Sequence, residues 1–226
     1  TTVCGVVFCV FSFTYLFFYQ GNLLAMEQHV LSHGITQYNK LLGAVIITLV
    51  LQLLQLGFDT VTRHCIKQPA LTYLPSALFL AIISDVSPEV DCGYSLGKWV
   101  WLAPLLLLLY VFVAYASASV LANNDGIAHK SQACIMWENM LIMGGLMTFV
   151  CCTANSNRIF HQRMQMENLI YKEKYEDAAN VFVGKTDRDS SLTMLRAYAL
   201  SKTGAMAEKL FEYPLKGGSD ALLPGY

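Results

Sequence analysis

Five apolar segments dominate the first two thirds of the chain: residues 3–19, 41–58, 71–86, 99–122 and 134–154. The fourth segment is uncharged throughout, begins with Trp99 and Trp101, and has Pro104 in its first turns. About 20 consecutive apolar residues are enough to cross a bilayer as a helix, and tryptophan is enriched at the membrane surface. The pattern therefore predicts a polytopic bundle of about five transmembrane helices over residues 1–155.

Two of these segments need a separate argument. Residues 3–19 have no basic stretch before them and no small-residue cleavage site after them, so we expect an uncleaved spanning helix rather than a signal peptide. Residues 71–86 contain Pro75 and are short for a span. If this segment failed to cross, the later part of the topology would invert.

Beyond Asn155 the charge density rises and apolar residues recur at helical spacing. Phe160 and Met164 fit one helix, and Asp189 and Ser190 are suitable cap residues for a later helix that Gly204 would end. We therefore expect residues 156–226 to form a water-facing helical segment, and the chain as a whole to be all-α.

Part of this segment resembles a tetratricopeptide repeat. Tyr175, Ala178 and Phe182 match the Tyr-x-x-Ala-x-x-x-Phe spacing of that repeat, and Gly204 follows Glu173 at close to the repeat length. Glu173 stands where the repeat usually has a turn glycine. Because a stable array needs at least about three repeats, the resemblance implies that residues 156–226 begin a longer native domain.

The composition supports a membrane protein and argues against a soluble domain, a nucleic-acid-binding protein and a disulfide-rich protein. Of the residues, 55% are hydrophobic and 14% are charged, against about 25% charged in soluble domains. The net charge of −1 argues against a nucleic-acid partner. Most of the seven cysteines lie in apolar runs, and none has zinc-like spacing, so we predict neither a disulfide framework nor a cysteine metal site.

Three polar residues fall inside the apolar segments. Gln52 and Gln55 are three residues apart and share a helix face, which we expect to point into the bundle because a buried amide needs a partner. This face is either a packing contact between helices or part of a polar transport path. Glu138 lies about one turn inside its segment, beside Trp137, and has either an interfacial or a functional role.

Two further groups of polar residues are weak candidates for metal sites. His29 and His33 are four residues apart on the amphipathic connection 20–40, but no third ligand accompanies them. Asp85, Glu89 and Asp91 lack the spacing of a calcium loop and are expected to be solvated. We predict no metal site and no cofactor.

The short connections suggest an orientation. Arg63 and Lys67 place the second connection in the cytoplasm by the positive-inside rule, which puts the acidic third connection and the C-terminal segment outside. Arg158 and Arg163, just after the fifth segment, argue for the opposite orientation.

Several stretches are similar to uncharacterised multi-pass membrane proteins of Bacteroidota, in which repeat-like helices follow a membrane bundle. They are residues 19–24 (YQGNLL), 28–32 (QHVLS), 84–88 (SDVSP), 190–200 (SSLTMLRAYAL) and 210–215 (LFEYPL). The resemblance implies a bacterial inner-membrane location and a longer native chain, but no activity. The outer side expected for the C-terminal segment from the charges would then be the periplasm.

These observations favour a non-enzymatic membrane scaffold or accessory subunit of a membrane complex. Its expected partners are the lipid bilayer and other membrane or periplasmic subunits, and Tyr175, Tyr198 and Phe211 are the candidate partner-binding residues. The alternative is a transporter or channel component that uses Gln52, Gln55 and Glu138. The sequence holds no nucleotide loop, HExxH or GxSxG motif, so we predict no catalytic residue.

Overall fold

The computed structural model describes residues 2–62, 68–86, 98–123, 132–181, 189–213 and 215. These residues form helices, turns and irregular segments, and none of them belongs to a strand, in agreement with the predicted all-α class. The contacts divide the chain into two compact units. The first unit comprises Thr1–Gly21 and Asn39–Asn155, and the second comprises Asn22–Tyr38 and Ser156–Tyr226.

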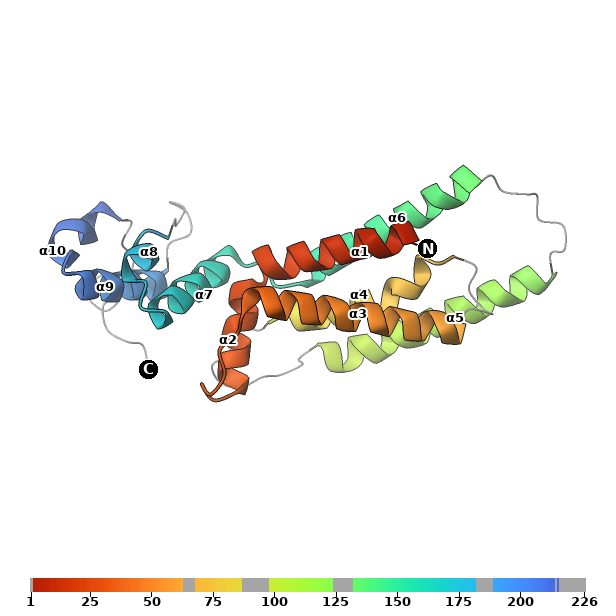
Figure 1. Cartoon of the computed structure of the whole chain (residues 1–226), viewed down its shortest axis with the longest axis horizontal. Coiled ribbons are helices and arrows are strands. Elements are labelled where there is room, and N and C mark those ends of the chain that lie inside the picture. The colour runs from red at the N-terminus through yellow and green to blue at the C-terminus, as the bar shows by residue number, and fades with distance from the viewer. Residues whose placement is uncertain are drawn as a thin grey trace. The chain divides into compact units, whose positions relative to one another are not determined.

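The first unit contains all five predicted apolar segments, and each of them is helical (Figure 1). The elements are α1 (Thr2–Thr14) with the π-helical turn η1 (Tyr15–Tyr19), α3 (Lys40–Thr62), the 3-10 turn η2 (Leu71–Tyr73) with α4 (Leu74–Ser84), α5 (Trp99–Asn123) and α6 (Gln132–Thr153). Within the described ranges, three stretches are long and apolar enough to cross a membrane: Thr2–Tyr19, Lys40–Thr62 and Gln132–Thr153. The apolar stretches Leu71–Ser84 and Trp99–Phe112 are shorter, although α5 as a whole has 25 residues.

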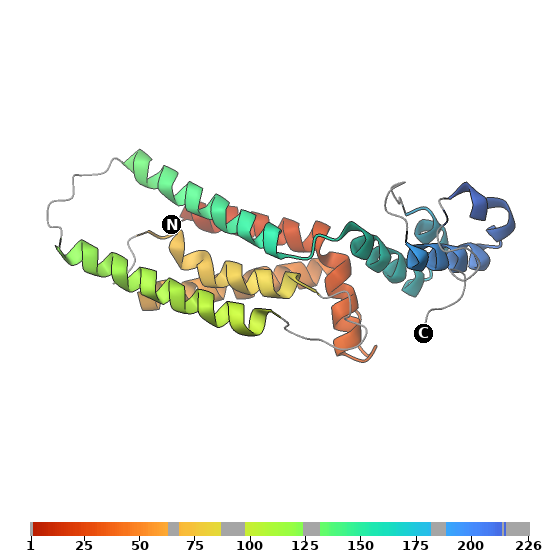
Figure 2. The same ribbon diagram turned by 180° about the vertical axis from the view of Figure 1, so that it is seen from behind.

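Consecutive helices of this unit run in alternating directions alongside one another (Figures 1 and 2). At one end of the unit, the Asn155 backbone N–H donates to the Ser84 carbonyl at 3.3 Å, so α4 and α6 end together. At the same end, the Trp99 indole N–H donates to the Asp85 carboxylate at 2.8 Å, so α5 starts where α4 ends. Towards the other end, the Ala70 N–H donates to Asn139 Oδ1 of α6 at 3.2 Å.

The short helix α4 is the most enclosed element of the first unit. It contacts α3, α5 and α6, and Figure 2 shows it between α5 and α6. Seven of its 11 residues are buried. Pro75 lies in its first turn, where no N–H is needed for an intrahelical bond. The segment that the sequence marked as short therefore forms the centre of the unit.

Each long helix of the first unit buries one face and exposes large apolar side chains on the opposite face. The buried positions recur every three or four residues: Cys4, Phe8 and Ser12 on α1 with Leu16 on η1, and Ala44, Thr48, Leu51 and Gln55 on α3. The outward positions are valines and leucines, among them Val6, Val10, Leu49, Leu53 and Leu108. Monomeric soluble proteins rarely expose contiguous apolar surface of this extent.

The second unit is built from one helix near the N-terminus and the helices after residue 156. They are α2 (Gly21–Leu31), α7 (Arg158–Tyr171), α8 (Tyr175–Ala179), α9 (Ser190–Thr203), α10 (Met206–Lys209) and the 3-10 turn η4 (Leu210–Glu212). The Asn157 side chain caps α7 by accepting from the N–H groups of Ile159 and Phe160. The main core cluster of the second unit consists of Ala178, Ala179, Ala197, Ala199, Leu200 and Leu210.

The turn after α7 has the bond pattern of a Schellman cap. The Lys174 N–H donates to the Leu169 carbonyl at 2.9 Å, and the Glu173 N–H donates to the Ile170 carbonyl at 2.9 Å. Glu173 has φ +57°, in the left-handed region that glycine adopts most readily. Glu173 therefore adopts the backbone conformation that glycine usually adopts at this position of the repeat.

The turn after α9 repeats this cap. Gly204 has φ +73°, its N–H donates to the Ser201 carbonyl at 3.3 Å, and the Ala205 N–H donates to the Leu200 carbonyl at 3.1 Å. The prediction that Gly204 ends this helix is confirmed. Like α7, α9 has 14 residues and precedes a short helix. However, α8 has only five residues and is capped at Asn180, and the motif residue Phe182 lies outside the described residues.

Candidate functional site

The two glutamines predicted to share a face of α3 have different surroundings. Gln55 is buried, and its Nε2 donates to Thr72 Oγ1 at 3.1 Å, which links α3 to η2. One turn earlier, Ser76 Oγ donates to the Leu51 carbonyl at 2.8 Å. Gln52 is half-buried, and its side chain interacts with Cys9 of α1. Gln55 therefore makes a contact between helices.

Glu138 lies in the second turn of α6 and is half-buried. The Cys134 thiol, one turn earlier on the same helix, donates to Glu138 Oε1 at 3.9 Å. The neighbouring Asn139 is buried and accepts from the Ala70 N–H. Around this position, the contact between helices is therefore made by the amide of Asn139.

In the part of the chain that the structure describes, the side chains singled out as weak metal candidates have separate surroundings. The His29 ring packs edge-on against Tyr171, with ring centres 5.0 Å apart, whereas His33 lies in the turn after α2 with φ +50°. Asp85 accepts from Trp99 and also pairs with Lys98 at 2.8 Å. Among the described residues, no three His, Cys, Asp or Glu side chains form a cluster that could hold a metal ion. Glu89, Asp91, Arg63 and Lys67 lie outside the described residues.

Two of the three predicted partner-binding residues lie together. The rings of Tyr175 on α8 and Tyr198 on α9 are 6.4 Å apart, and Lys202 Nζ lies 5.4 Å from the centre of the Tyr198 ring. Tyr198 is 45% exposed, and Phe211 on η4 is 81% exposed. Tyr198 and Phe211 thus present aromatic surface to the surroundings, whereas Tyr175 also packs against the core.

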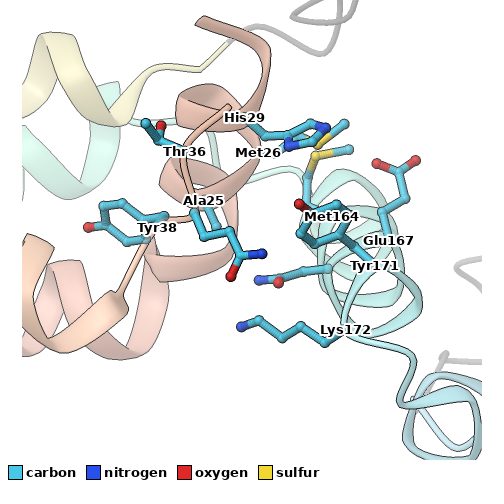
Figure 3. Close-up of a pocket in the computed structure, with 11 residues that line it drawn as sticks. Ala25, Met26, His29, Thr36, Tyr38, Met164, Glu167, Tyr171 and Lys172 are labelled. Carbon is cyan, nitrogen blue, oxygen red and sulfur yellow. The ribbon is translucent and has the colours of Figure 1, made fainter. Parts of the chain in front are cut away.

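A pocket of about 240 Å³ lies within the second unit, between α2, the residues that follow it, and α7 (Figure 3). It is lined by Ala25, Met26, His29, Thr36, Gln37, Tyr38, Met164, Glu167, Asn168, Tyr171 and Lys172. Sequence reasoning singled out His29, for a different role, and Met164, only as part of a helix face. Nothing in the sequence predicts that the other lining residues meet in one pocket, because they come from segments more than 120 residues apart.

Short-range hydrogen bonds build the α2 side of this pocket. Gly34 has φ +79°, which lets the chain reverse after α2 and return along it. The Gln28 amide donates to Thr36 Oγ1 at 2.9 Å, and the Thr36 N–H donates to Ser32 Oγ at 3.3 Å. These bonds hold residues 36–38 beside α2, where they form one wall of the pocket.

Contacts between α2 and α7 hold the two walls together. The Asn168 amide donates to Asn22 Oδ1 at 3.1 Å, and the rings of His29 and Tyr171 are in contact. The Glu167 carboxylate turns away from the pocket (Figure 3) and pairs with Arg163 Nε at 2.7 Å. The Lys172 side chain extends towards the α2 side (Figure 3). The pocket thus combines an apolar wall, which includes Met164, with a cationic edge.

A buried acid lies on the same helix as the pocket. Glu27 is only 9% exposed, and burial raises its pKa from 4.5 to about 7. Tyr38 lies close enough for the Glu27 charge to act on it; burial, and then this charge, raise the pKa of Tyr38. The Tyr38 hydroxyl is buried and has no hydrogen-bond partner within the described part of the chain.

We expect Glu27→Gln to make the protein more stable above pH 7. Because the pKa of Glu27 is higher in the folded state, folding takes up a proton, and stability falls as pH rises from about 4.5 to 7. The variant should gain about 1–2 kcal/mol at pH 8, after allowance for solvent screening, and little at pH 4.5. Thermal unfolding of the full chain in mild detergent measures this difference. The exposed Glu176→Gln is the control, and an equal gain at both pH values would contradict the argument.

Of three comparisons with known proteins, the one with protein families gave a match. Neither the curated proteins nor the solved structures gave a match. The family model described as a family of unknown function (DUF6057) matches residues 93–226. This range takes in α5 and α6 of the first unit and the helices of the second unit from α7 onward. Because the match covers more than half of the chain, the chain belongs to the family of unknown function DUF6057.

Proposed function

We propose that the chain is a membrane-embedded scaffold, or an accessory subunit of a membrane complex, whose second unit binds protein partners. The observation that carries this proposal is the exposure of Tyr198 and Phe211 on a small helical core. Aromatic residues are enriched in protein interfaces and among the residues that dominate binding energy.

The distribution of side chains in the first unit supports insertion into a bilayer. Its interior includes small or polar residues such as Ser12 and Ala44, while Leu49, Leu53 and other large apolar side chains face outward along whole helices. Small residues let helices approach closely in lipid, where a large apolar exterior is favourable. We propose that all five apolar helices belong to the bundle. Because its longer neighbours enclose α4, a short helix suffices there.

The alternating helix directions support one topology. The first apolar helix, α4 and α6 end at the same end of the bundle, so the chain leaves towards the second unit on the side where α5 begins. With Arg63 and Lys67 on the cytoplasmic side, the second unit would be periplasmic in a bacterial inner membrane. Arg163, which argued against this orientation, pairs with Glu167. Because the rule counts Lys and Arg rather than net charge, Arg158 and Arg163 still favour the opposite orientation.

The two equivalent turns support a relationship to tetratricopeptide-like hairpins. Both follow a 14-residue helix, and both place one residue in the left-handed region, at Glu173 and at Gly204. The five-residue α8 departs from that repeat, whose second helix is longer. We propose two helical hairpins of a related kind, which present α8, α9 and η4 to partners.

The transporter alternative has weaker support. A transport path needs polar groups that remain accessible to a solute, but the Gln55 amide is bound to Thr72 and lies in the packed interior. Gln52 and Glu138 lie on different helices and are each half-buried. Uptake measurements with Gln52→Ala and Glu138→Gln over a broad solute panel would test this alternative.

We expect the double variant Tyr198→Asp/Phe211→Asp to lose the protein partners of the chain. Placing a carboxylate in an interface at each aromatic position should weaken co-purification from native membranes in mild detergent at least tenfold. The conservative pair Tyr198→Phe/Phe211→Leu is the matched control and should retain the partners. If the natural chain ran alone as a monodisperse monomer, the scaffold proposal would fail.

A further inference from the structure

We propose that the pocket between α2 and α7 binds the phosphate-bearing headgroup of an anionic phospholipid. This inference rests on the proposed membrane location, but not on the proposed protein partners.

The lining is suited to an amphiphile. Met164 is buried, and Met26 and Tyr171 add apolar surface to it, while Thr36 and Asn168 supply a hydroxyl and an amide. Methionine side chains adapt to irregular apolar ligands because they are flexible and polarisable. A ligand with apolar and polar parts can therefore satisfy both halves of this lining.

The charge of the lining favours an anionic group. Glu167 also lines the pocket, but its carboxylate turns away from the centre (Figure 3) and pairs with Arg163, which compensates its charge. Lys172 extends towards the α2 side of the pocket (Figure 3), and an ammonium group is a common ligand of phosphate in proteins. His29 also lines the pocket and can donate a hydrogen bond to a phosphate oxygen.

The start of α2 brings this lining close to lipid headgroups. The first apolar helix ends at Tyr19 and α2 begins at Gly21, so Ala25 lies only about 6 Å further along the α2 axis, at about 1.5 Å per residue. The headgroup layer on each side of a bilayer is roughly 5–8 Å thick. The volume of about 240 Å³ lies below the roughly 300–1,000 Å³ of pockets for whole small molecules. It fits a headgroup whose acyl chains remain in the bilayer.

Lipid binding by the full chain tests this proposal. Native mass spectrometry of the detergent-extracted chain would count adducts formed with dihexanoyl phosphatidylglycerol, with dihexanoyl phosphatidylcholine and with inorganic phosphate. We expect phosphatidylglycerol to bind at least fivefold more tightly than phosphatidylcholine, with no adduct from phosphate alone. Lys172→Gln should reduce phosphatidylglycerol binding at least fivefold, whereas Lys174→Gln, which removes an exposed charge outside the lining, should leave it unchanged.

A second variant tests the cavity itself. Met26→Trp fills the pocket from a half-buried position, keeps Lys172, and should also reduce phosphatidylglycerol binding. Equal losses in Lys172→Gln and Lys174→Gln would indicate attraction to surface charge and overturn the proposal. Binding of inorganic phosphate at the same site would show that the pocket recognises free phosphate, and it would overturn a lipid headgroup as the ligand. Partner co-purification by the Lys172→Gln variant should be unchanged, so failure of this proposal is distinguishable from failure of the scaffold.

Discussion

Replacing Leu49 and Leu53 together by arginine should abolish membrane insertion of the chain. The two leucines are 58% and 68% exposed and lie one turn apart near the middle of α3. An arginine at the centre of a spanning helix costs about 2.5–3.5 kcal/mol of insertion free energy, so two should cost about 5–7 kcal/mol. In a protein surrounded by water, an exposed leucine could become arginine at almost no cost.

Alkaline extraction of membranes, followed by quantification of the chain in the pellet, measures this effect. The matched control replaces Tyr198 and Phe211, which are exposed aromatic residues of the second unit, by arginine. We expect the control to remain in the pellet at the level of the natural chain. If the α3 variant also remained in the pellet, or if the natural chain stayed folded in buffer without detergent, the bilayer would not be its environment.

Arg196→Ala should destabilise the second unit by about 3–5 kcal/mol. Arg196 is buried on α9, and its Nε and Nη2 donate to the carbonyls of Ala179 and Val181 at 3.0 and 2.6 Å. Its guanidinium carbon also lies 4.3 Å from the centre of the Tyr213 ring. Removing it leaves two buried carbonyls without this donor, and each such loss costs roughly 1–3 kcal/mol.

Urea unfolding of the full chain in mild detergent, followed by far-ultraviolet circular dichroism, would measure this loss. Arg196→Lys should recover only part of the stability, because an ammonium lacks the planar fork that reaches both carbonyls. Lys202→Ala on the same helix is the control, and we expect a change of less than about 1 kcal/mol since this cation is exposed. Equal effects of Arg196→Ala and Lys202→Ala would contradict a structural role for the guanidinium.

The role of Arg196 was not predictable from the sequence. A lone arginine in a helix with mixed apolar and polar neighbours has the pattern of a solvated residue, and nothing in its spacing points to α8. The helix α8 ends after five residues, and its last carbonyls need a donor from elsewhere in the fold. Only packing of α9 against α8 brings the guanidinium to those carbonyls.

The pocket between α2 and α7 illustrates the same limit. The sequence identified α2 as an amphipathic connection and predicted α7 as a helix, both from local periodicity. The cavity, however, depends on contacts such as Asn22 with Asn168 and His29 with Tyr171, whose partners lie more than 120 residues apart. Such pairings leave no trace in the spacing of either segment. The burial of Glu27 depends on the same folding of the chain.

The sequence alone determined the all-helical class, the five apolar helices and the end of α9 at Gly204, because length, apolar content and backbone preference act locally. Except on α3, where Gln55 marked the buried face, the tertiary structure decided which side of each apolar helix is buried, since a helix that is apolar all round has no preferred face. It also placed the short α4 at the centre of its unit, where polar contacts at Ser84 and Asn139 fix it. Which faces meet depends on small residues and hydrogen bonds between distant segments, and these act only after the chain has folded.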